Sequence, residues 1–200
     1  MPWHTTRTQS DGSRRWDQRA FIGILIGLVA VWGVEISAAW AGEALSESQV
    51  KAAFLVNFPK YVDWPAVAFA ETNSPLVIAV LGETPVTDEL QKLIAGRTVN
   101  GRKIVLRRLD AGEEVAGCHI LFVSALEQSR ASSLLARLKD SGVLTVGESD
   151  DFLEHGGIVN LARRERKIAL EVNLTAATTA RIKISSRLLS VASVVKGKAN

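Results

Sequence analysis

Residues Leu76-Val77-Ile78-Ala79-Val80-Leu81 form the stretch that decides the fold, because six apolar residues follow one another without a polar break. A strand with one face in water would alternate apolar and polar residues, so this continuous run predicts a strand covered on both faces. Gly82 then starts a turn, and Thr84 or Thr87 can cap a helix that runs to about Ala95. A strand, a turn and a helix in this order predict a layered α/β unit.

The same alternation of strands and helices continues toward the C-terminus. Asn100-Gly101 is typical of a type I′ turn, and it leads into a strand at Lys103–Leu109. Cys118–Val123 and Val143–Val146 are apolar enough to be further buried strands, with a helix at Ser129–Lys139 between them. Parallel strands joined by helices explain this order.

The last fifty residues favour a hairpin and helices. Phe152–His155 predicts a helical turn ended by two glycines, and Ile158–Leu161 and Lys167–Asn173 resemble the two arms of a hairpin. Helical character continues over Thr175–Val195, with a break near Ile184-Ser185-Ser186. The fold class predicted is α/β (α+β): a single layered domain over residues 42–200, with a mixed β-sheet flanked by helices and a C-terminal hairpin and helices.

A capped helix precedes the first strand. Ser46 and Gln49 have the spacing of a capping box, in which each side chain accepts a hydrogen bond from the other residue's backbone N–H. Pro59 removes a backbone donor, so the helix should kink or end near Leu55–Phe58. Spacings of four, four and three place these apolar residues on one helical face: Val50, Phe54, Phe58 and Tyr61.

The first 41 residues have the pattern of an export signal. Arg14, Arg15 and Arg19 lead into an apolar run from Ala20 to Val34, and Ala39-Trp40-Ala41 supplies small residues for cleavage. A helix over this run would rise about 22 Å, which is short of the roughly 30 Å hydrocarbon core of a bilayer. Residues 1–41 are therefore predicted to be a signal peptide cleaved after Ala41, which places the protein in the periplasm. An uncleaved N-terminal anchor is the alternative.

Charge and composition exclude several classes of partner. Four of the 24 basic and three of the 21 acidic residues precede Gly42, so the rest of the chain is only weakly basic. Such a balance gives no reason to expect binding to nucleic acid or to an anionic membrane. No apolar run after Ala41 approaches spanning length, so stable membrane insertion is not expected after cleavage.

Metal, cofactor and disulfide chemistry are not expected either. Cys118 is the only cysteine, so the chain cannot form an intramolecular disulfide. Beyond residue 41 the only other histidines or cysteines are His119 and His155, too few for a structural zinc site. No glycine-rich phosphate loop is present, and Gly82 before a helix is only a weak signal for an anion site.

Two residue patterns leave a catalytic or a binding role open. His119 and Ser124 could form a hydrolase pair, although Val123-Ser124-Ala125 lacks the glycines of a nucleophile elbow. Glu171 alternates with the apolar residues of its strand, so it lies on the face away from the core. From this pattern Glu171 is either a surface charge or an interface anchor.

An ordered set of short motifs resembles the YfiR family of small periplasmic proteins, over about Ser48 to Val191. The pieces are Lys51-Ala52-Ala53-Phe54-Leu55-Val56-Asn57-Phe58, Trp64-Pro65, Ile78-Ala79-Val80-Leu81-Gly82, Val99-Asn100-Gly101-Arg102-Lys103-Ile104, Cys118-His119-Ile120-Leu121-Phe122-Val123, Leu144-Thr145-Val146, Phe152, Gly156-Gly157-Ile158-Val159-Asn160-Leu161, Leu170-Glu171-Val172-Asn173 and Ile184-Ser185-Ser186-Arg187-Leu188-Leu189. No piece is diagnostic alone, whereas their order is fairly specific.

The resemblance implies regulation rather than catalysis. Members of the family are periplasmic repressors that bind the sensor domain of YfiN, an inner-membrane diguanylate cyclase, and they form homodimers. Carried over by position, Phe152, Ile158 and Glu171 are expected to bind the partner, and charge reversal at Glu171 to weaken the complex without unfolding the domain. Redox sensing through an internal disulfide is excluded, because Cys118 has no second cysteine to pair with. The alternative function is a periplasmic sensor of a small ligand, for which strand ends next to helices offer clefts.

Overall fold

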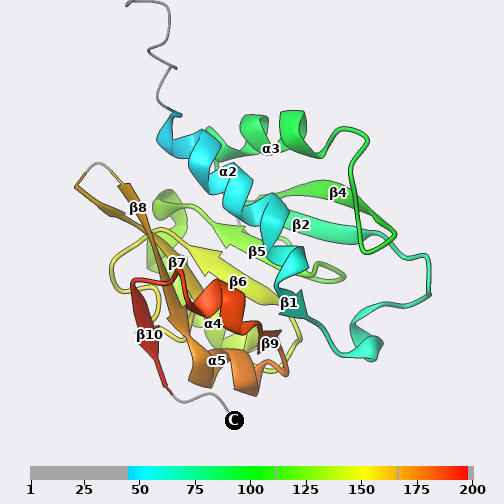
Figure 1. Ribbon diagram of the computed structural model, residues 1–200. Helices are drawn as coiled ribbons and strands as arrows, with labels where there is room; N and C mark the ends of the chain where they lie inside the picture. Colours follow the sequence, from blue (N-terminus) through cyan, green and yellow to red (C-terminus); the bar gives the residue numbers. More distant parts are fainter. Residues whose placement is uncertain (1–44, 111, 166, 198–200) are drawn as a thin grey trace, which may run out of the picture. The chain divides into compact units, whose positions relative to one another are not determined.

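The structure is a computed structural model that describes residues 45–110, 112–165 and 167–197. The predicted signal peptide and its cleavage site lie outside the described residues, so both stay predictions. The chain forms an eight-stranded mixed sheet in the order β10-β8-β7-β6-β5-β2-β4-β3, flanked by helices as predicted (Figure 1). A second, two-stranded sheet joins β1 and β9.

The helices and strands alternate along most of the chain. The strands are β1 (Val62–Asp63), β2 (Leu76–Leu81), β3 (Thr98–Val99), β4 (Arg102–Leu109), β5 (Ile120–Val123), β6 (Leu144–Gly147), β7 (Val159–Arg164), β8 (Lys167–Asn173), β9 (Lys183–Ile184) and β10 (Val194–Lys196). The α-helices are α2 (Glu47–Asn57), α3 (Val86–Ile94), α4 (Gln128–Leu138), α5 (Leu174–Thr179) and α6 (Ser186–Leu189). Short 3-10 turns cover Phe58–Lys60, Ala66–Ala68 and Ala125–Glu127.

Parallel pairing dominates the centre of the sheet. β4, β2, β5, β6 and β7 pair in parallel, whereas β3 with β4 and β7 with β8 are antiparallel. As predicted from its continuous apolar run, β2 is covered on both faces: Ile78 packs in one core and Ala79 in the other, and both are fully buried. The carboxyl ends of β2, β5, β6 and β7 therefore lie along one edge of the sheet.

Two hydrophobic cores sandwich the sheet. The main core packs the sheet against α2, α3, α5 and α6, and Figure 1 shows α2 crossing in front of the strands. The second core packs the other face against α4 and against the segment after β6, through Ala131, Leu135, Leu138, Phe152 and Leu153. The segment that follows β6 also contacts the hairpin, since Asp150 pairs with Arg164 of β7 and the Leu153 carbonyl accepts a hydrogen bond from Asn173 of β8.

The first helix of the described residues, α2, begins as the sequence predicts. Ser46 accepts a hydrogen bond from the Gln49 N–H, and Gln49 Oε1 accepts one from the Ser46 N–H, which completes the capping box. The α-helix ends at Asn57, before Pro59. The face in the core is not the one that the apolar spacing marked, however. Ala52, Leu55, Val56 and Phe58 are buried, whereas these residues are only partly buried: Val50, Phe54 and Tyr61.

The predicted type I′ turn is confirmed, whereas the predicted C-terminal helical region is only partly correct. Asn100 and Gly101 have φ angles of 49° and 78°, as a type I′ turn between β3 and β4 requires. The predicted helical character over Thr175–Val195 is only partly correct, since β9 and β10 follow α5 and α6. β10 pairs in parallel with β8, a long-range contact that overrides local propensity.

Candidate functional site

Glu171 is a buried acid on the β7–β8 hairpin, in a cluster of polar groups that reaches the surface. Its carboxylate is 6% exposed and accepts a hydrogen bond from Asn160 Nδ2 at 3.0 Å. It also pairs with the Arg164 guanidinium at 2.8 Å, and Arg164 reaches Asp150 Oδ1 at 2.6 Å. Hydrogen bonds to Asp150 and Glu171 raise the pKa of Arg164. Arg164 therefore ties the hairpin to the segment after β6.

Phe152 holds that segment against the sheet through its buried ring. Its ring is 1% exposed and lies between two glycines, Gly147 at the end of β6 and Gly157 before β7. A Cβ atom added at Gly147 would come 2.3 Å from the ring, and one at Gly157 would come 2.2 Å from it. Glycine is required at both positions because only a hydrogen atom leaves room for the ring. We call residues 148–157 the β6–β7 loop.

Ile158 anchors the end of this loop. Its side chain is 2% exposed and packs in the main core. Its N–H donates to Thr145 Oγ1 at 3.1 Å, and its carbonyl accepts from the Asn173 N–H at 2.8 Å. The loop is thus tied down at its start by Arg164, in its middle by Phe152 and at its end by Ile158.

The structure changes how the three predicted partner-binding residues are understood. Glu171 does lie on the face away from the main core, as predicted, but it is buried there and is bonded to Arg164, which also bonds Asp150 of the β6–β7 loop. Phe152, Ile158 and Glu171 are all buried, so their side chains do not form an exposed surface. Whether they affect a partner stays a prediction, and in this structure they can act only through the loop. The effect of reversing the charge of Glu171 also stays a prediction, and we now expect it to destabilise the domain, because a cation at this buried position would face Arg164.

A second polar network was missed by sequence reasoning. The Lys51 ammonium, 5% exposed on α2, pairs at 2.5 Å with Glu47 and at 2.5 Å with Glu148. Glu148 also accepts from the Ala125 N–H at 2.8 Å, and Glu47 pairs with Arg163 at 3.1 Å. Burial works to lower the pKa of Lys51, but hydrogen bonds to both carboxylates outweigh it and raise that pKa. Only the Glu47–Lys51 spacing of four could have been noticed in the sequence.

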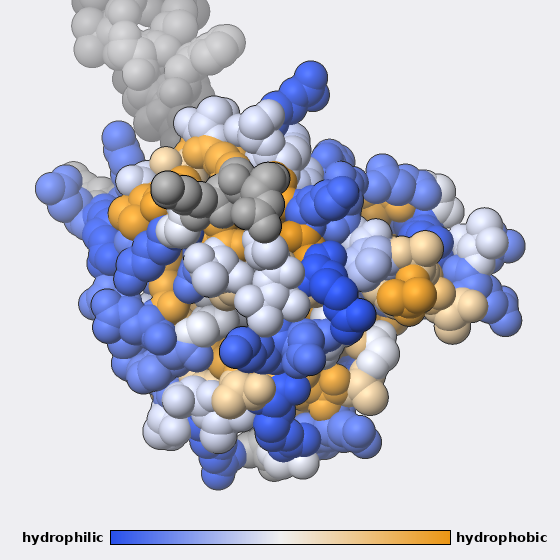
Figure 2. All heavy atoms as spheres, turned by 90° about the horizontal axis from the view of Figure 1, so that it is seen from below, coloured by the Kyte–Doolittle hydropathy of each residue, from blue (hydrophilic) through white to orange (hydrophobic). Residues whose placement is uncertain are grey.

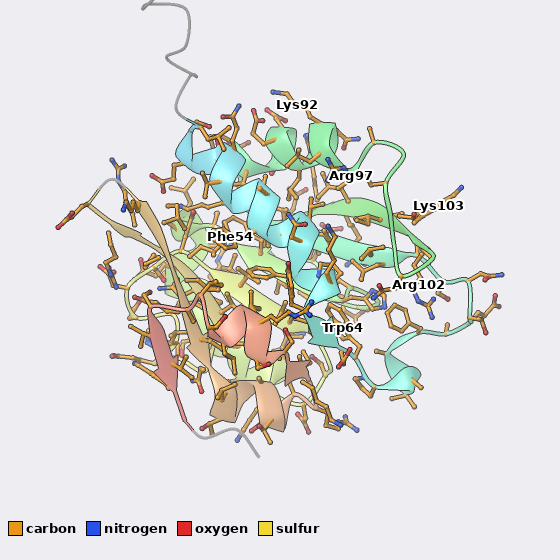
Figure 3. All side chains as sticks on the ribbon, in the orientation of Figure 1. Phe54, Trp64, Lys92, Arg97, Arg102 and Lys103 are labelled. Atoms are coloured by element: carbon orange, nitrogen blue, oxygen red, sulfur yellow. The ribbon has the colours of Figure 1, made fainter. Side chains whose placement is uncertain are left out.

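An apolar groove runs along α2 on the side that faces β8 and α6. Three adjoining hollows of about 520 to 610 Å³ share Phe54. Figure 3 shows the Phe54 ring between α2 and α6. We call this surface the α2 groove and define it by the apolar residues that line it: Leu45, Val50, Phe54, Ile168 and Val191.

A separate cavity of about 370 Å³ lies between α4 and α5. Leu138, Val143 and Ile158 contribute apolar surface to it, and Lys139 and His155 contribute polar groups. Seen from below, hydrophilic side chains cover most of the molecule, and apolar ones lie between them in small groups (Figure 2). The cavity is within the size range of sites for small molecules.

His119 and Ser124 do not form a catalytic pair. They flank β5 at opposite ends, about 16 Å apart at strand spacing. The His119 ring accepts from the Val77 N–H through Nδ1 at 3.1 Å, lies 3.1 Å from the Ala68 carbonyl through Nε2, and stacks on Phe69 at 4.3 Å. Both ring nitrogens have a hydrogen-bonding partner, so the imidazole holds the segment before β2 in place.

We expect His119 to make the protein less stable in mild acid. Burial lowers the pKa of His119, helped by the charge of Arg102 and opposed by the Ala68 carbonyl. The unfolded chain takes up the proton near pH 6.5, whereas the folded chain resists it, so stability is full above that pH and falls below it by up to about 1.4 kcal/mol per pH unit. Thermal unfolding from pH 7.5 to 5 measures the slope. His119→Gln should flatten it, and an identical slope in the variant would refute the assignment.

The surroundings of the Gly82 turn and of the Cys118 thiol exclude both as sites of binding or chemistry. The Gly82 turn is no anion site: a Cβ there would lie 2.6 Å from Ser124 Oγ, and the first turn of α3 already carries Asp88 and Glu89. Burial raises the pKa of the Cys118 thiol to about 11, so it stays an unreactive thiol. Among the residues described, no three acidic, histidine or cysteine side chains gather as metal ligands would. Nor does any helix in that part of the chain have the length and apolar character to cross a membrane.

Solved structures support the fold. A crystal structure of a conserved domain protein from Vibrio cholerae O1 biovar El Tor strain N16961 matches with a TM-score of 0.55 and 14% sequence identity. The match covers 76% of this chain and 61% of that one, so this chain spans about three fifths of the solved protein. At this identity the likeness shows the fold alone.

Sequence comparison gives the family. No curated protein matches the chain. A family model described as YfiR/HmsC-like matches residues 48–193. This range runs from the second residue of α2 to beyond α6 and includes the β6–β7 loop and the hairpin. Because the match covers well over half of the sequence, the chain belongs to the YfiR/HmsC-like family.

Proposed function

We propose that the protein is a periplasmic regulator that binds the periplasmic sensor domain of an inner-membrane diguanylate cyclase and represses the production of cyclic di-GMP. Membership of the YfiR/HmsC-like family carries this proposal. A regulator of this kind must bind the inactive form of its target more tightly than the active form, since equal affinity would shift nothing.

We further propose that the β6–β7 loop is the partner-facing surface. Phe152, Ile158 and Glu171 hold the loop from beneath, while Asp150 and Glu154 project from it with side chains 86% and 70% exposed. The buried residues then set the shape of the loop and the acidic ones meet the partner. A loop fixed in advance loses little conformational entropy on binding.

Removing the exposed charges should weaken the complex without unfolding the protein, because asparagine at position 150 can still accept from Arg164 and the Glu154–Lys196 pair is exposed. We expect the double variant Asp150→Asn, Glu154→Arg to bind the purified sensor domain at least about tenfold more weakly, because charge complementarity is lost at the contact. Titration calorimetry measures the affinity, and cellular cyclic di-GMP should rise in parallel. Asp88→Arg on α3, where the side chain is 75% exposed, is the matched control. Full affinity in the double variant would exclude the loop as the partner-facing surface. A wild-type protein without affinity for the sensor domain would exclude the proposed regulatory function.

A small-ligand sensor is the second candidate, and the cavity between α4 and α5 favours it. Ile158, Glu154, His155 and Gly156 line this cavity, so a bound molecule would touch the β6–β7 loop directly. A thermal-shift screen with amino acids and nucleotides tests it. A screen without any stabilising compound would count against this candidate.

A further inference from the structure

We infer that the α2 groove is a docking site for an amphipathic helix whose apolar face is flanked by acidic residues. A helix at the surface of a domain normally buries one apolar stripe and turns polar residues outward. α2 departs from this rule. Ala52, Leu55 and Val56 fill the core, yet Val50 and Phe54 leave a second apolar side partly exposed.

The groove continues beyond α2 onto neighbouring elements. Ile168 of β8 and Val191 after α6 extend its floor, and Leu45 closes it at the start of the helix. Leu45 is 69% exposed and Val191 is 66% exposed. Apolar residues from three separate parts of the chain thus line one hollow, and burying them would remove apolar surface from water.

Cations stand at the two ends of this apolar floor. Arg163 and Lys167 line the end next to the hairpin together with Glu47 and Glu165, and Arg187 lines the end next to α6. Glu47 already neutralises Arg163. Lys167 and Arg187 have no ion pair with any of the described residues. A ligand that fits must therefore be apolar in the middle and carry an anionic group near each end.

An amphipathic helix meets these requirements best. α2 has 11 residues, so the groove beside it runs about 16 Å, the length of three helical turns. Apolar side chains spaced i, i+3, i+4 and i+7 on a partner helix would follow such a floor, as in other helix-in-groove complexes. An anionic lipid surface is a poorer fit, because Phe54 lies in a hollow between α2 and α6 rather than on a protruding tip.

The test uses designed helical peptides and the exported protein. One peptide of about 12 residues carries leucines at helical spacing with glutamates at both ends. A comparison peptide has the same leucines but carries lysines at both ends. Fluorescence anisotropy should show that the acidic peptide binds at least about tenfold more tightly than the basic one. Phe54→Asp should abolish binding of the acidic peptide. Val67→Asp, at an 83% exposed valine outside the groove, should change nothing.

A charge swap makes the test decisive. The double variant Lys167→Glu, Arg187→Glu should reverse the preference and bind the basic peptide more tightly. Its melting temperature should equal that of the wild type, because both side chains are unpaired among the described residues. Equal affinity for both peptides, or no binding by the wild type, would overturn the inference.

Other occupants of the groove would give different readouts, and each would overturn the inference. If the groove joined two copies of the chain, sedimentation would show a dimer that Phe54→Asp dissociates, and the peptides would not compete. If it met a membrane, vesicles containing phosphatidylglycerol would retain the wild type and not Phe54→Asp. The inference does not depend on the proposed partner, because it can hold even where the sensor domain fails to bind the β6–β7 loop.

Discussion

Substituting Gly147 with alanine is expected to lower the free energy of unfolding by about 3 kcal/mol, because the new methyl group overpacks a full core. All three atoms nearest to the added Cβ belong to the ring of Phe152, at 2.3 to 2.6 Å. The ring is buried and cannot move aside without lifting the β6–β7 loop. Urea unfolding followed by circular dichroism measures the loss, and the affinity for the sensor domain should fall with it.

A double-mutant cycle shows whether the ring is the cause. Phe152→Ala alone should cost about 3–5 kcal/mol, and adding Gly147→Ala to it should cost almost nothing further. Gly157→Ala should remain costly in the same background, since its Cβ would also lie 2.8 Å from the Phe152 carbonyl oxygen. Gly96→Ala, which has open space and a φ of 69°, should lose only about 1 kcal/mol from backbone strain. If the losses in free energy of unfolding at Gly147 and Phe152 were additive, contact with the Phe152 ring would not be the reason that Gly147→Ala is costly.

Replacing Lys51 with alanine should destabilise the protein by about 3–5 kcal/mol, the usual result of removing one partner from a buried ion pair. Glu47 and Glu148 would then face each other without the cation that both now contact at 2.5 Å. The hydrogen bond from Lys51 chiefly lowers the pKa of Glu47, so this part of the stability is present above the ordinary pKa of glutamate and lost as the pH falls through the lowered value.

The pattern of rescue separates charge from packing. Lys51→Met combined with Glu148→Gln should recover much of the loss, because the apolar chain of methionine fills the space and only one carboxylate remains. Lys92→Ala is the control: Lys92 pairs with Glu89, but its side chain is 69% exposed, so it should cost less than about 1 kcal/mol. Equal losses for Lys51→Ala and Lys92→Ala in urea unfolding would contradict the buried network.

The sequence predicts the central fold well, because local signals and packing agree there. The unbroken apolar run of β2, the capping box of α2 and the Asn100-Gly101 turn each act over a few residues, and each is found in the structure. β10 could not be predicted in the same way. Its pairing with β8 joins residues more than twenty positions apart, and no local pattern marks it.

The candidate site could be predicted only in outline. Alternation along β8 placed Glu171 correctly on the face away from the main core. It could not show that the β6–β7 loop folds over this face, since that depends on the contact of Phe152 with Gly147 and Gly157. The partner of Lys51 was equally hidden, because Glu148 is 97 positions away in the chain. Long-range packing decides burial, and burial decides which charges can meet a partner.

Arg163 and Arg164 are neighbours in β7, and their side chains leave opposite faces of the sheet. Arg163 pairs with Glu47 at the rim of the α2 groove, while Arg164 pairs with Asp150 in the β6–β7 loop. One short piece of backbone therefore connects both surfaces. A guest that displaced this backbone at one arginine would also move the other, and thermodynamic reciprocity would make such a coupling run equally in both directions. The hairpin thus places the α2 groove and the β6–β7 loop within one residue of each other along β7.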